Sequence, residues 1–243
     1  MKVLILINKV GLGDCIIHLN YIHEISKKYE KPVSILAKEN TRAKDLFQDD
    51  PHIKEVITLD RLETNTGSHD GFNGFIKLIK DIKEKKFDKV FIFNSSVRYF
   101  LVCKFAGIKK IAQYPLFKKK GQHVVNTAKI FTENEIDKIV STQPKLFVNQ
   151  DKILKAQKNM PLNNKCIVLG ISASGPTKRW EIKNFIKLSE KINQKFPSKF
   201  YLAAGKNDQP LINEISNSNI GSNCVSLNNL KINEMLPIIA NCN

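Results

Sequence analysis

Three short segments of the chain combine residue types that could take part in catalysis or bind an anion: residues 11–14, 171–180 and 203–208. Each follows an apolar run typical of a strand and precedes apolar residues at helical spacing. In an open α/β sheet, ligands bind outside the carboxyl ends of the strands, which is where such turns lie. The three segments therefore hold the candidate functional residues.

The first segment, Gly11-Leu12-Gly13-Asp14, joins glycines to a carboxylate. Gly11 and Gly13 let the backbone approach a ligand closely, and the helix that follows offers free N–H groups. Asp14 would repel a phosphate at the same place, so it is suited to act as a general base that takes the proton of a sugar hydroxyl. Asp is also a favoured helix N-cap, and the segment alone leaves both roles open. Its spacing is not the G-x-G-x-x-G dinucleotide fingerprint.

The second segment, residues 171–180, places hydroxyl and cationic side chains at the start of a predicted helix. Ser174 and Thr177 are compact donors, and Lys178 and Arg179 lie where a diphosphate could rest near helix N–H groups. The segment lacks the spacing of a P-loop. In the alternative, purely structural interpretation, Ser174 or Thr177 caps the helix, the two cations are solvated and the tryptophan packs.

The third segment closes the next strand with Gly205, Lys206, Asn207 and Asp208. Gly205, Asn207 and Asp208 could line the base or ribose of a nucleotide. Turns rich in these residue types are common between strands and helices, so this segment gains meaning only beside the other two.

The apolar pattern predicts alternating strands and helices, that is, an α/β protein with parallel sheets. In the first half we expect strands at 2–7, 33–37, 55–58, 89–93 and 110–112 and helices at 14–29, 42–47, 74–86 and 97–105. After the segment 145–148 and a polar helix and linker around 150–165, we expect strands at 165–171, 199–204 and 224–227 and helices at 180–196, 209–216 and 232–240. This predicts two domains, 1–150 and 151–243. Since a doubly wound sheet has about five or six strands, we expect the second to be incomplete.

The charge balance favours an anionic partner. Lys and Arg exceed Asp and Glu by 39 to 23, which gives a formal net charge of +16. The excess is spread over both halves, so a concentrated nucleic-acid-binding stripe is not indicated. The run Lys118, Lys119 and Lys120 is interpreted as a solvated loop rather than a phosphate or lipid contact.

Cysteine usage favours a reducing compartment. The five cysteines are far apart and show neither a C-x-x-C pair nor zinc-ligand spacing, so we expect free, mostly buried thiols and no metal. The amino-terminal apolar run ends in a glycine turn rather than a signal-peptide cleavage site. No run reaches the length of about 18 apolar residues that a membrane span needs.

Together the three segments resemble glycosyltransferase family 9, which contains the ADP-heptose:lipopolysaccharide heptosyltransferases. The resemblance covers nearly the whole chain and rests on the GLGD turn, on SASGPTKRW roughly 160 residues later and on LAAGKND; the K-R-W run is its most specific piece. It implies a GT-B fold of two Rossmann-like doubly wound domains, with the acceptor on the first and the nucleotide-sugar donor on the second. It also implies inverting, metal-independent transfer of a sugar, heptose for an ADP-heptose donor, to a lipopolysaccharide core or related glycan.

The resemblance also implies roles for single residues. Asp14 matches the family's proposed general base, and Lys178 matches the lysine that contacts the donor diphosphate and offsets leaving-group charge. Ser174 matches a small hydroxyl position beside it, and Asn207 or Asp208 falls near an acidic position that holds the donor. No cofactor is implied, because the nucleotide-sugar is a substrate. A cytoplasmic enzyme would meet a lipid-linked or core oligosaccharide acceptor at the cytosolic face of the inner membrane, as a peripheral protein on an anionic surface.

The sequence departs from the family at its carboxyl end. Family members continue from a helix like residues 236–240 into a strand and a Gly-Asn-Asp-[ST]-Gly-Pro-x-x-x-His segment that helps bind the donor diphosphate, and this sequence does not contain it. We therefore expect a fragment of a longer protein. Two alternatives are a GT-B transferase or epimerase-like enzyme that uses a UDP-sugar, and a non-catalytic nucleotide- or glycan-binding module.

Overall fold

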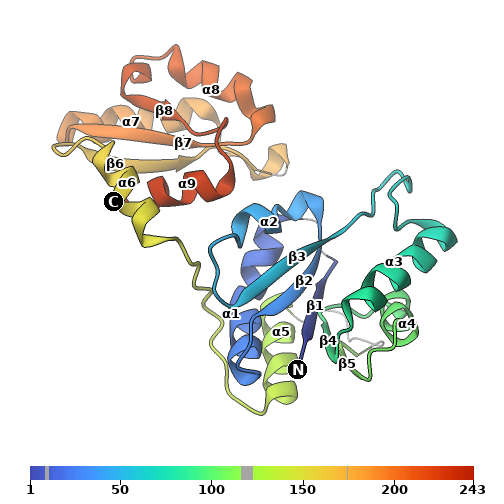
Figure 1. Cartoon of the computed structure of the whole chain (residues 1–243). Helices are drawn as coiled ribbons and strands as arrows, with labels where there is room; N and C mark the ends of the chain where they lie inside the picture. The colour runs from blue at the N-terminus through green and yellow to red at the C-terminus, as the bar shows by residue number, and fades with distance from the viewer. Residues whose placement is uncertain (9–10, 116–122, 174) are drawn as a thin grey trace. The chain divides into compact units, whose positions relative to one another are not determined.

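The computed structural model describes residues 1–8, 11–115, 123–173 and 175–243. Lysines 118–120 and Ser174 therefore lie outside the described residues. The chain divides into two compact units, Met1–Phe147 and Val148–Asn243. Each unit is built on a parallel sheet with helices on its faces (Figure 1), which confirms the predicted α/β class with two parallel sheets.

In its described part, the first unit contains a five-stranded sheet in the order β3-β2-β1-β4-β5. The strands are β1 (Val3–Ile7), β2 (Val33–Lys38), β3 (Ile53–Leu59), β4 (Lys89–Ile92) and β5 (Lys110–Gln113). The helices are α1 (Leu12–Lys28), α2 (Ala43–Leu46), α3 (Gly71–Lys85), α4 (Val97–Phe105), α5 (Val124–Ile136) and the short 3-10 helix η1 (Glu39–Thr41). Because β1 pairs with a strand on each side and helices cover both faces, all five of its residues are buried.

Both faces of this sheet are covered. Leu4 and Leu6 of β1 belong to one core, in which α3 contributes Leu78 and α4 contributes Val102. Alternate residues of a strand point to opposite faces, so Ile5 lies on the other side, where α1 packs beside α5 (Figure 1). Because all five strands are parallel, the segments that lead from each strand to the next helix start at the same edge of the sheet, the carboxyl edge.

The second unit contains a three-stranded parallel sheet in the order β6-β7-β8 within its described residues. Its elements are β6 (Lys165–Gly170), β7 (Ser198–Ala203), β8 (Cys224–Ser226), α6 (Gln150–Lys158), α7 (Ile182–Lys195), α8 (Gln209–Ser216), α9 (Ile232–Ile239) and the 3-10 helices η2 (Pro176–Lys178), η3 (Lys206–Asp208) and η4 (Gly221–Asn223). One core joins α7 and α8 to Phe200 and Leu202. On the other face a smaller core, with Tyr201 and Leu227, includes side chains of α9.

The structure differs from the predicted elements at two places. The helix expected from Asp14 begins at Leu12, because Gly11 already has the extended backbone of an N-cap. The helix α5 was not predicted, because its buried face carries Thr127 and Thr132 beside Ala128 and Phe131, which interrupts the apolar spacing.

The chain leaves the first unit along α1, beside the buried His23 and the half-buried His52. The Phe147 ring packs edge-on against the imidazoles of His23 and His52, with centroids 5.3 and 5.6 Å away. His23 Nε2 lies 2.7 Å from the buried Asp50 carboxylate, and burial lowers the pKa of His52. These contacts fix the last residue of the unit on α1.

The thiols and helices agree with the expectations from composition. All five cysteines are free; three are buried and two are half-buried. Burial raises the pKa of Cys103 to about 12, so this thiol is a packing group. Within the described residues, every helix is too short or too polar to cross a bilayer.

Candidate functional site

Asp14 lies at the carboxyl edge of the first sheet, in the first turn of α1. Its Oδ2 atom accepts the Gly11 N–H at 3.1 Å, and its own N–H donates to the Gly11 carbonyl at 3.1 Å. The N-cap is thus Gly11, and Asp14 is the third helical residue, so Asp14 does not itself occupy the cap position. The side chain is half-buried, which leaves part of the carboxylate open to solvent.

A buried histidine of α1, His18, contacts the backbone of this turn. His18 is fully buried, and its Nδ1 atom lies 2.6 Å from the Asp14 carbonyl, to which it donates. Its ring packs edge-on against Phe93, which directly follows β4. Gly13 is exposed, and a Cβ atom there would meet nothing within 4 Å, so no contact among the described residues requires glycine at this position.

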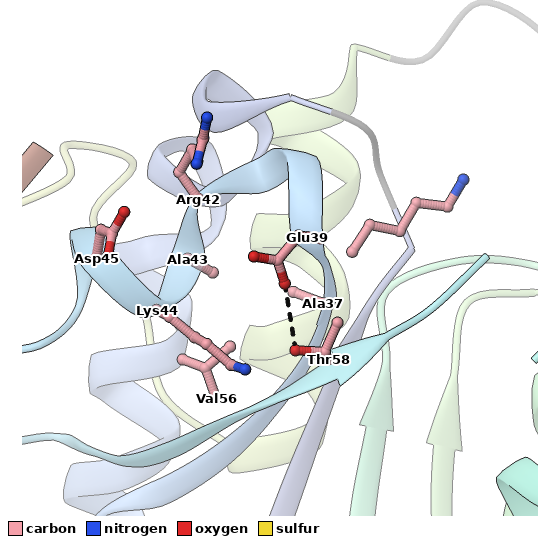
Figure 2. A pocket seen from close by; sticks show the side chains of 9 residues that line it. Ala37, Glu39, Arg42, Ala43, Lys44, Asp45, Val56 and Thr58 are labelled. Carbon is pink, nitrogen blue, oxygen red and sulfur yellow. Dashed lines mark hydrogen bonds between the residues drawn. The ribbon is translucent and has the colours of Figure 1, made fainter. Parts of the chain in front are cut away.

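A hollow opens next to the carboxyl ends of β2 and β3. It has a volume of about 750 Å³ and is lined by residues 38–40, 42 and 59–64. A smaller hollow, of about 80 Å³, lies beside it and shares Lys38, Glu39 and Arg42 (Figure 2). There Thr58 Oγ1 donates to Glu39 Oε2 at 3.4 Å, while the exposed Arg42 side chain points away from this hydrogen bond.

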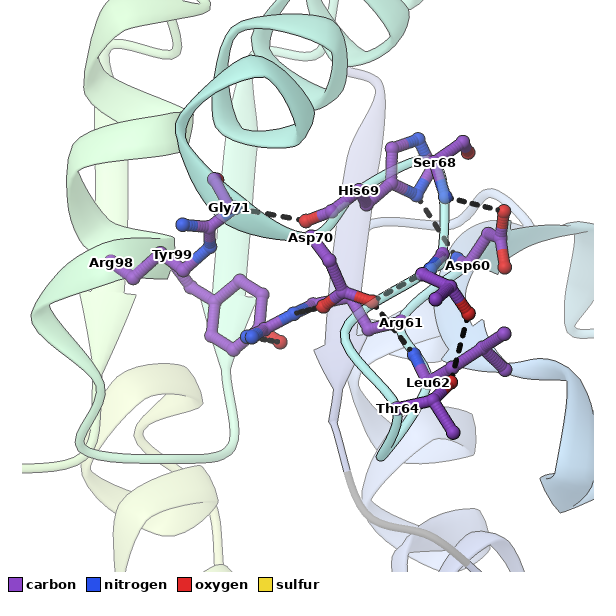
Figure 3. Close-up of polar contacts among 12 residues, drawn as sticks. Asp60, Arg61, Leu62, Thr64, Ser68, His69, Asp70, Gly71, Arg98 and Tyr99 are labelled. Carbon is purple, nitrogen blue, oxygen red and sulfur yellow. Dashed lines mark hydrogen bonds and ion pairs between the residues drawn. The ribbon is translucent and has the colours of Figure 1, made fainter.

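An ion pair organises the loop that follows β3 (Figure 3). Asp70 Oδ1 accepts from Arg61 Nε at 2.9 Å, and Asp70 Oδ2 accepts the N–H groups of Leu62 and Gly67 at 3.0 Å each. Arg98 Nη2 donates to the carbonyls of His69 and Gly71. These contacts fix Arg61 at the edge of the larger hollow.

The same contacts make the Asp70 carboxyl a strong acid. The hydrogen bond from Arg61, followed by that from the Leu62 N–H, lowers the pKa of Asp70 from 3.8 to about 2. Because the pKa is lower in the folded state, this contribution to stability is present above the unfolded pKa and is lost as the pH falls from about 4 to about 2. The loop therefore keeps its arrangement at neutral pH.

In the second unit, the residues predicted to hold a diphosphate follow β6. The 3-10 helix η2 includes Thr177 and Lys178, both exposed, and the Lys178 N–H donates to the Gly175 carbonyl at 3.1 Å. Trp180 is 50% exposed and packs edge-on against Phe185, with centroids 5.0 Å apart. Thr177 and Lys178 thus face solvent at the carboxyl end of β6.

Arg179 points back into the unit and joins two of the predicted segments. Its Nε and Nη2 atoms donate to the Ala173 carbonyl at 3.3 and 3.2 Å, and Nη2 also lies 3.2 Å from Asp208 Oδ1. Asp208 is only 7% exposed, and its Oδ2 atom accepts the Gly205 N–H at 2.9 Å. Both carboxylate oxygens of Asp208 are therefore engaged, whereas Asn207 is exposed.

The two units repeat one local geometry at the end of a strand. Gly205 and Asp208 make the same pair of hydrogen bonds as Gly11 and Asp14, with the Asp N–H donating to the Gly carbonyl at 3.0 and 3.1 Å. The structure thus places Asp14 in one unit and Gly205, Asn207 and Asp208 with Lys178 in the other.

Sequence reasoning missed two polar groups at equivalent places. Arg61 follows β3, and the buried Asn228 follows β8, where its Nδ2 donates to Gln209 Oε1 at 2.8 Å. The rule that pointed to Asp14, that side chains after parallel strands meet at the carboxyl edge, would have found both. Within the described residues, no group of three or more His, Cys, Asp or Glu side chains could hold a metal ion.

Comparison with protein families gives a match to most of the chain. The model described as glycosyltransferase family 9 (heptosyltransferase) matches residues 75–243, which include every candidate residue of the second unit. No curated protein is significantly similar to the chain.

Solved structures share the fold at low sequence identity. The chain is similar to E. coli ADP-heptose lps heptosyltransferase II, with a TM-score of 0.77 and 18% identity over 100% of this chain and 77% of that one. A family 9 glycosyl transferase from Veillonella parvula gives 0.77 and 14%, over 99% and 74% of the two chains. E. coli heptosyltransferase WaaC with ADP-2-deoxy-2-fluoro heptose gives 0.69 and 11%, over 100% and 81%. The structural matches show the GT-B fold.

The contact between Arg179 and Asp208 yields a stability prediction. We expect Arg179→Ala and Asp208→Asn each to lower the free energy of unfolding of the second unit by about 1 kcal/mol, because the link between two strand-end turns is lost. The double variant should lose less than the sum, by about 0.5 kcal/mol or more. Urea unfolding followed by the fluorescence of the only tryptophan, Trp180, measures this directly. Strictly additive losses would show that the two side chains do not stabilise each other.

Proposed function

The chain belongs to glycosyltransferase family 9, and from that premise we propose that it transfers heptose from an ADP-sugar to a lipopolysaccharide core or related glycan, with inversion and without a metal ion. The observation that carries the proposal is that two strand ends present groups of opposite charge. A half-buried carboxylate, Asp14, follows β1, and an exposed cation, Lys178, follows β6. A solved relative that shares the fold contains ADP-2-deoxy-2-fluoro heptose, which supports an ADP-sugar as donor.

In the proposed reaction, the acceptor oxygen attacks the anomeric carbon of the donor sugar while the bond from that carbon to the diphosphate oxygen breaks. Asp14 takes the hydroxyl proton as the new bond forms, which makes the oxygen a better nucleophile. The diphosphate leaves with its electron pair, and the Lys178 ammonium offsets its negative charge. This electrostatic role is the one that a divalent cation fills in metal-dependent transferases.

We assign the acceptor to the first unit. The hollow at the ends of β2 and β3 has the size to take a sugar residue, and Lys38, Arg42 and Arg61 line it. An acceptor that carries carboxylate or phosphate groups would find cations there, whereas Glu39 and Asp60 would accept hydrogen bonds from its hydroxyls.

We assign the donor to the second unit. Gly175, Thr177 and Lys178 would contact the diphosphate, and Ser174, which precedes Gly175 in the sequence, would offer a further hydroxyl. Gly205 and the exposed Asn207 would line the ribose or base. Because Asp208 and Arg179 bind each other, we propose that they hold these two turns together and contact the donor less directly.

We further propose that the protein works in the cytoplasm, at the cytosolic face of the inner membrane, where a lipid-linked acceptor is found. The formal net charge of +16 supports peripheral contact with an anionic surface.

A thermal-shift panel tests the donor class. We expect ADP-sugars to raise the melting temperature and UDP- and GDP-sugars to have little effect; a ligand at about 100 times its Kd stabilises by about 2.7 kcal/mol. Stabilisation by UDP-sugars alone would instead favour the UDP-dependent transferase or epimerase-like alternative. A response to nucleotides without turnover in the complete gene product would favour a binding module.

Lys178→Ala should weaken donor binding more than it weakens the fold. Lys178 is exposed, so its loss costs the fold little, but a diphosphate would lose a charged contact of about 1.5–3 kcal/mol, which is about 10- to 150-fold in affinity. Titration of an ADP-sugar into the parent, Lys178→Ala and the control Lys191→Ala, an exposed lysine on α7, measures this. Unchanged affinity in Lys178→Ala would remove Lys178 from the donor site.

Asp14→Asn should separate the chemical role of this side chain from its structural one. An Asn oxygen can still accept the Gly11 N–H, so we expect the melting temperature and donor affinity to stay close to those of the parent. The amide cannot take up a proton at neutral pH, so turnover of the complete gene product should fall by about 10²–10⁴-fold. If turnover stays within a few fold of the parent, Asp14 closes the turn and another group is the base.

A further inference from the structure

Large apolar side chains are exposed together on the outer sides of α3 and α4. Phe72 is 77% exposed, Phe105 59%, Val97 52% and Ile76 38%. These four residues are called the α3–α4 surface below. Adjacent exposed apolar side chains of this size are uncommon on proteins that act alone in water, and they mark places where a protein meets another apolar surface.

Contacts between the helices make this surface continuous. Phe72, Phe75 and Ile76 lie at positions i, i+3 and i+4 of α3 and therefore share one side of the helix. The Phe75 ring meets Phe105 of α4 edge-on, with centroids 6.4 Å apart, so the apolar side chains extend from α3 onto α4. In Figure 1 the two helices lie side by side, and they also contact each other.

An arginine holds the first turns of the two helices together. Arg98 Nη2 donates to the Gly71 carbonyl at 3.0 Å, and the guanidinium carbon lies 5.3 Å from the centre of the Phe75 ring. Val97, beside Arg98, and Phe72, beside Gly71, are therefore carried by two turns that are fixed to each other. The surface is a rigid part of the fold rather than a loop.

The charges of α3 and α4 have mainly one sign. The two helices carry six basic side chains, on Lys77, Lys80, Lys83, Lys85, Arg98 and Lys104, and two acidic ones, on Asp81 and Glu84. Two of the lysines are paired with carboxylates, Lys77 with Asp81 at 2.6 Å and Lys85 with Glu55 at 2.7 Å. Lys80 follows Ile76 by one helical turn, and Lys104 precedes Phe105; both lysines are exposed. Exposed aromatic side chains beside lysines are suited to a layer whose interior is apolar and whose surface is anionic.

We propose that the α3–α4 surface docks on an anionic lipid bilayer, with Phe72 and Phe105 entering the interfacial region and Lys80 and Lys104 contacting lipid phosphates. A second copy of the chain fits less well, because a symmetric contact would bring two sets of basic side chains face to face. The inference deepens the proposed function by naming the surface that meets the membrane. It rests on the proposed function only in the reason for docking, which is to reach a lipid-linked acceptor.

Vesicle co-sedimentation of the full chain, without any sugar substrate, tests the proposal. We expect binding to vesicles of equal parts phosphatidylglycerol and phosphatidylcholine, and little binding to phosphatidylcholine alone. Phe72→Ser with Phe105→Ser, and separately Lys80→Glu with Lys104→Glu, should each weaken binding about tenfold, and high salt should weaken it further. The controls are Phe196→Ser, a phenylalanine of similar exposure at 53% in the second unit, and Lys191→Glu with Lys195→Glu on α7.

Three outcomes of the vesicle assay would overturn the proposal: no binding to anionic vesicles, binding that the two α3–α4 double variants leave at the parent level, or equal loss in the control variants. A parent that is a dimer in solution and becomes a monomer in Phe72→Ser with Phe105→Ser would also overturn it, since a second copy would then cover the surface. Circular dichroism shows that the variants are folded. Because no sugar is present, vesicle binding and sugar transfer can fail independently, and each failure points to its own proposal.

Discussion

Two carboxylates close the backbone turns on which both candidate sites depend. Asp14 Oδ2 accepts the Gly11 N–H, and Asp208 Oδ2 accepts the Gly205 N–H. In each turn a helical segment follows a parallel strand in the sequence, and the first N–H groups of that segment have no acceptor within the helix. A carboxylate three residues on satisfies one of them and adds negative charge where the helix dipole is positive. These two hydrogen bonds therefore fix the backbone of the turns that carry the candidate side chains.

The two turns share a geometry but leave their carboxylates in different surroundings. Asp208 gives its second oxygen to Arg179 and is nearly buried. Asp14 is half-buried, and among the described residues its Oδ1 atom has no hydrogen-bond partner. One carboxylate therefore ties two loops of its unit together, whereas the other keeps an oxygen that can accept a proton. The difference comes from a single cation, Arg179, that is present in the second turn.

The basic side chains of the protein lie in several different surroundings. Arg61 and Arg98 hold the loop after β3, where Asp70 and backbone carbonyls accept from them. Lys178 is exposed at the end of β6, and the exposed Lys80 and Lys104 lie beside exposed apolar side chains of α3 and α4. A net charge of +16 therefore has no single meaning. Its physical effect depends on which cations are engaged by carboxylates and which remain at the surface.

The sequence by itself determined the class of the fold and the places where chemistry could occur. Continuous apolar runs and helical spacing fixed nearly every strand and helix, because the core of a parallel sheet needs apolar residues on both faces of its inner strands. The strand ends that follow these runs pointed to Asp14, Lys178 and Asp208. Local pattern failed for α5, whose buried threonines resemble surface residues, since its partner is α1, far away in the sequence.

Only the tertiary structure decided what each candidate side chain contacts. No local pattern predicts the contact between Arg179 and Asp208, because 29 residues separate them. The pairing of β6 with β7 brings the two turns together. The sequence also did not decide whether Asp14 is a helix N-cap or a general base. In the structure the N-cap is Gly11, three residues before Asp14. Exposure of Phe72 and Phe105 follows in the same way from the packing of α3 on α4. Contacts between distant segments depend on how the chain folds back on itself, and no local pattern records that.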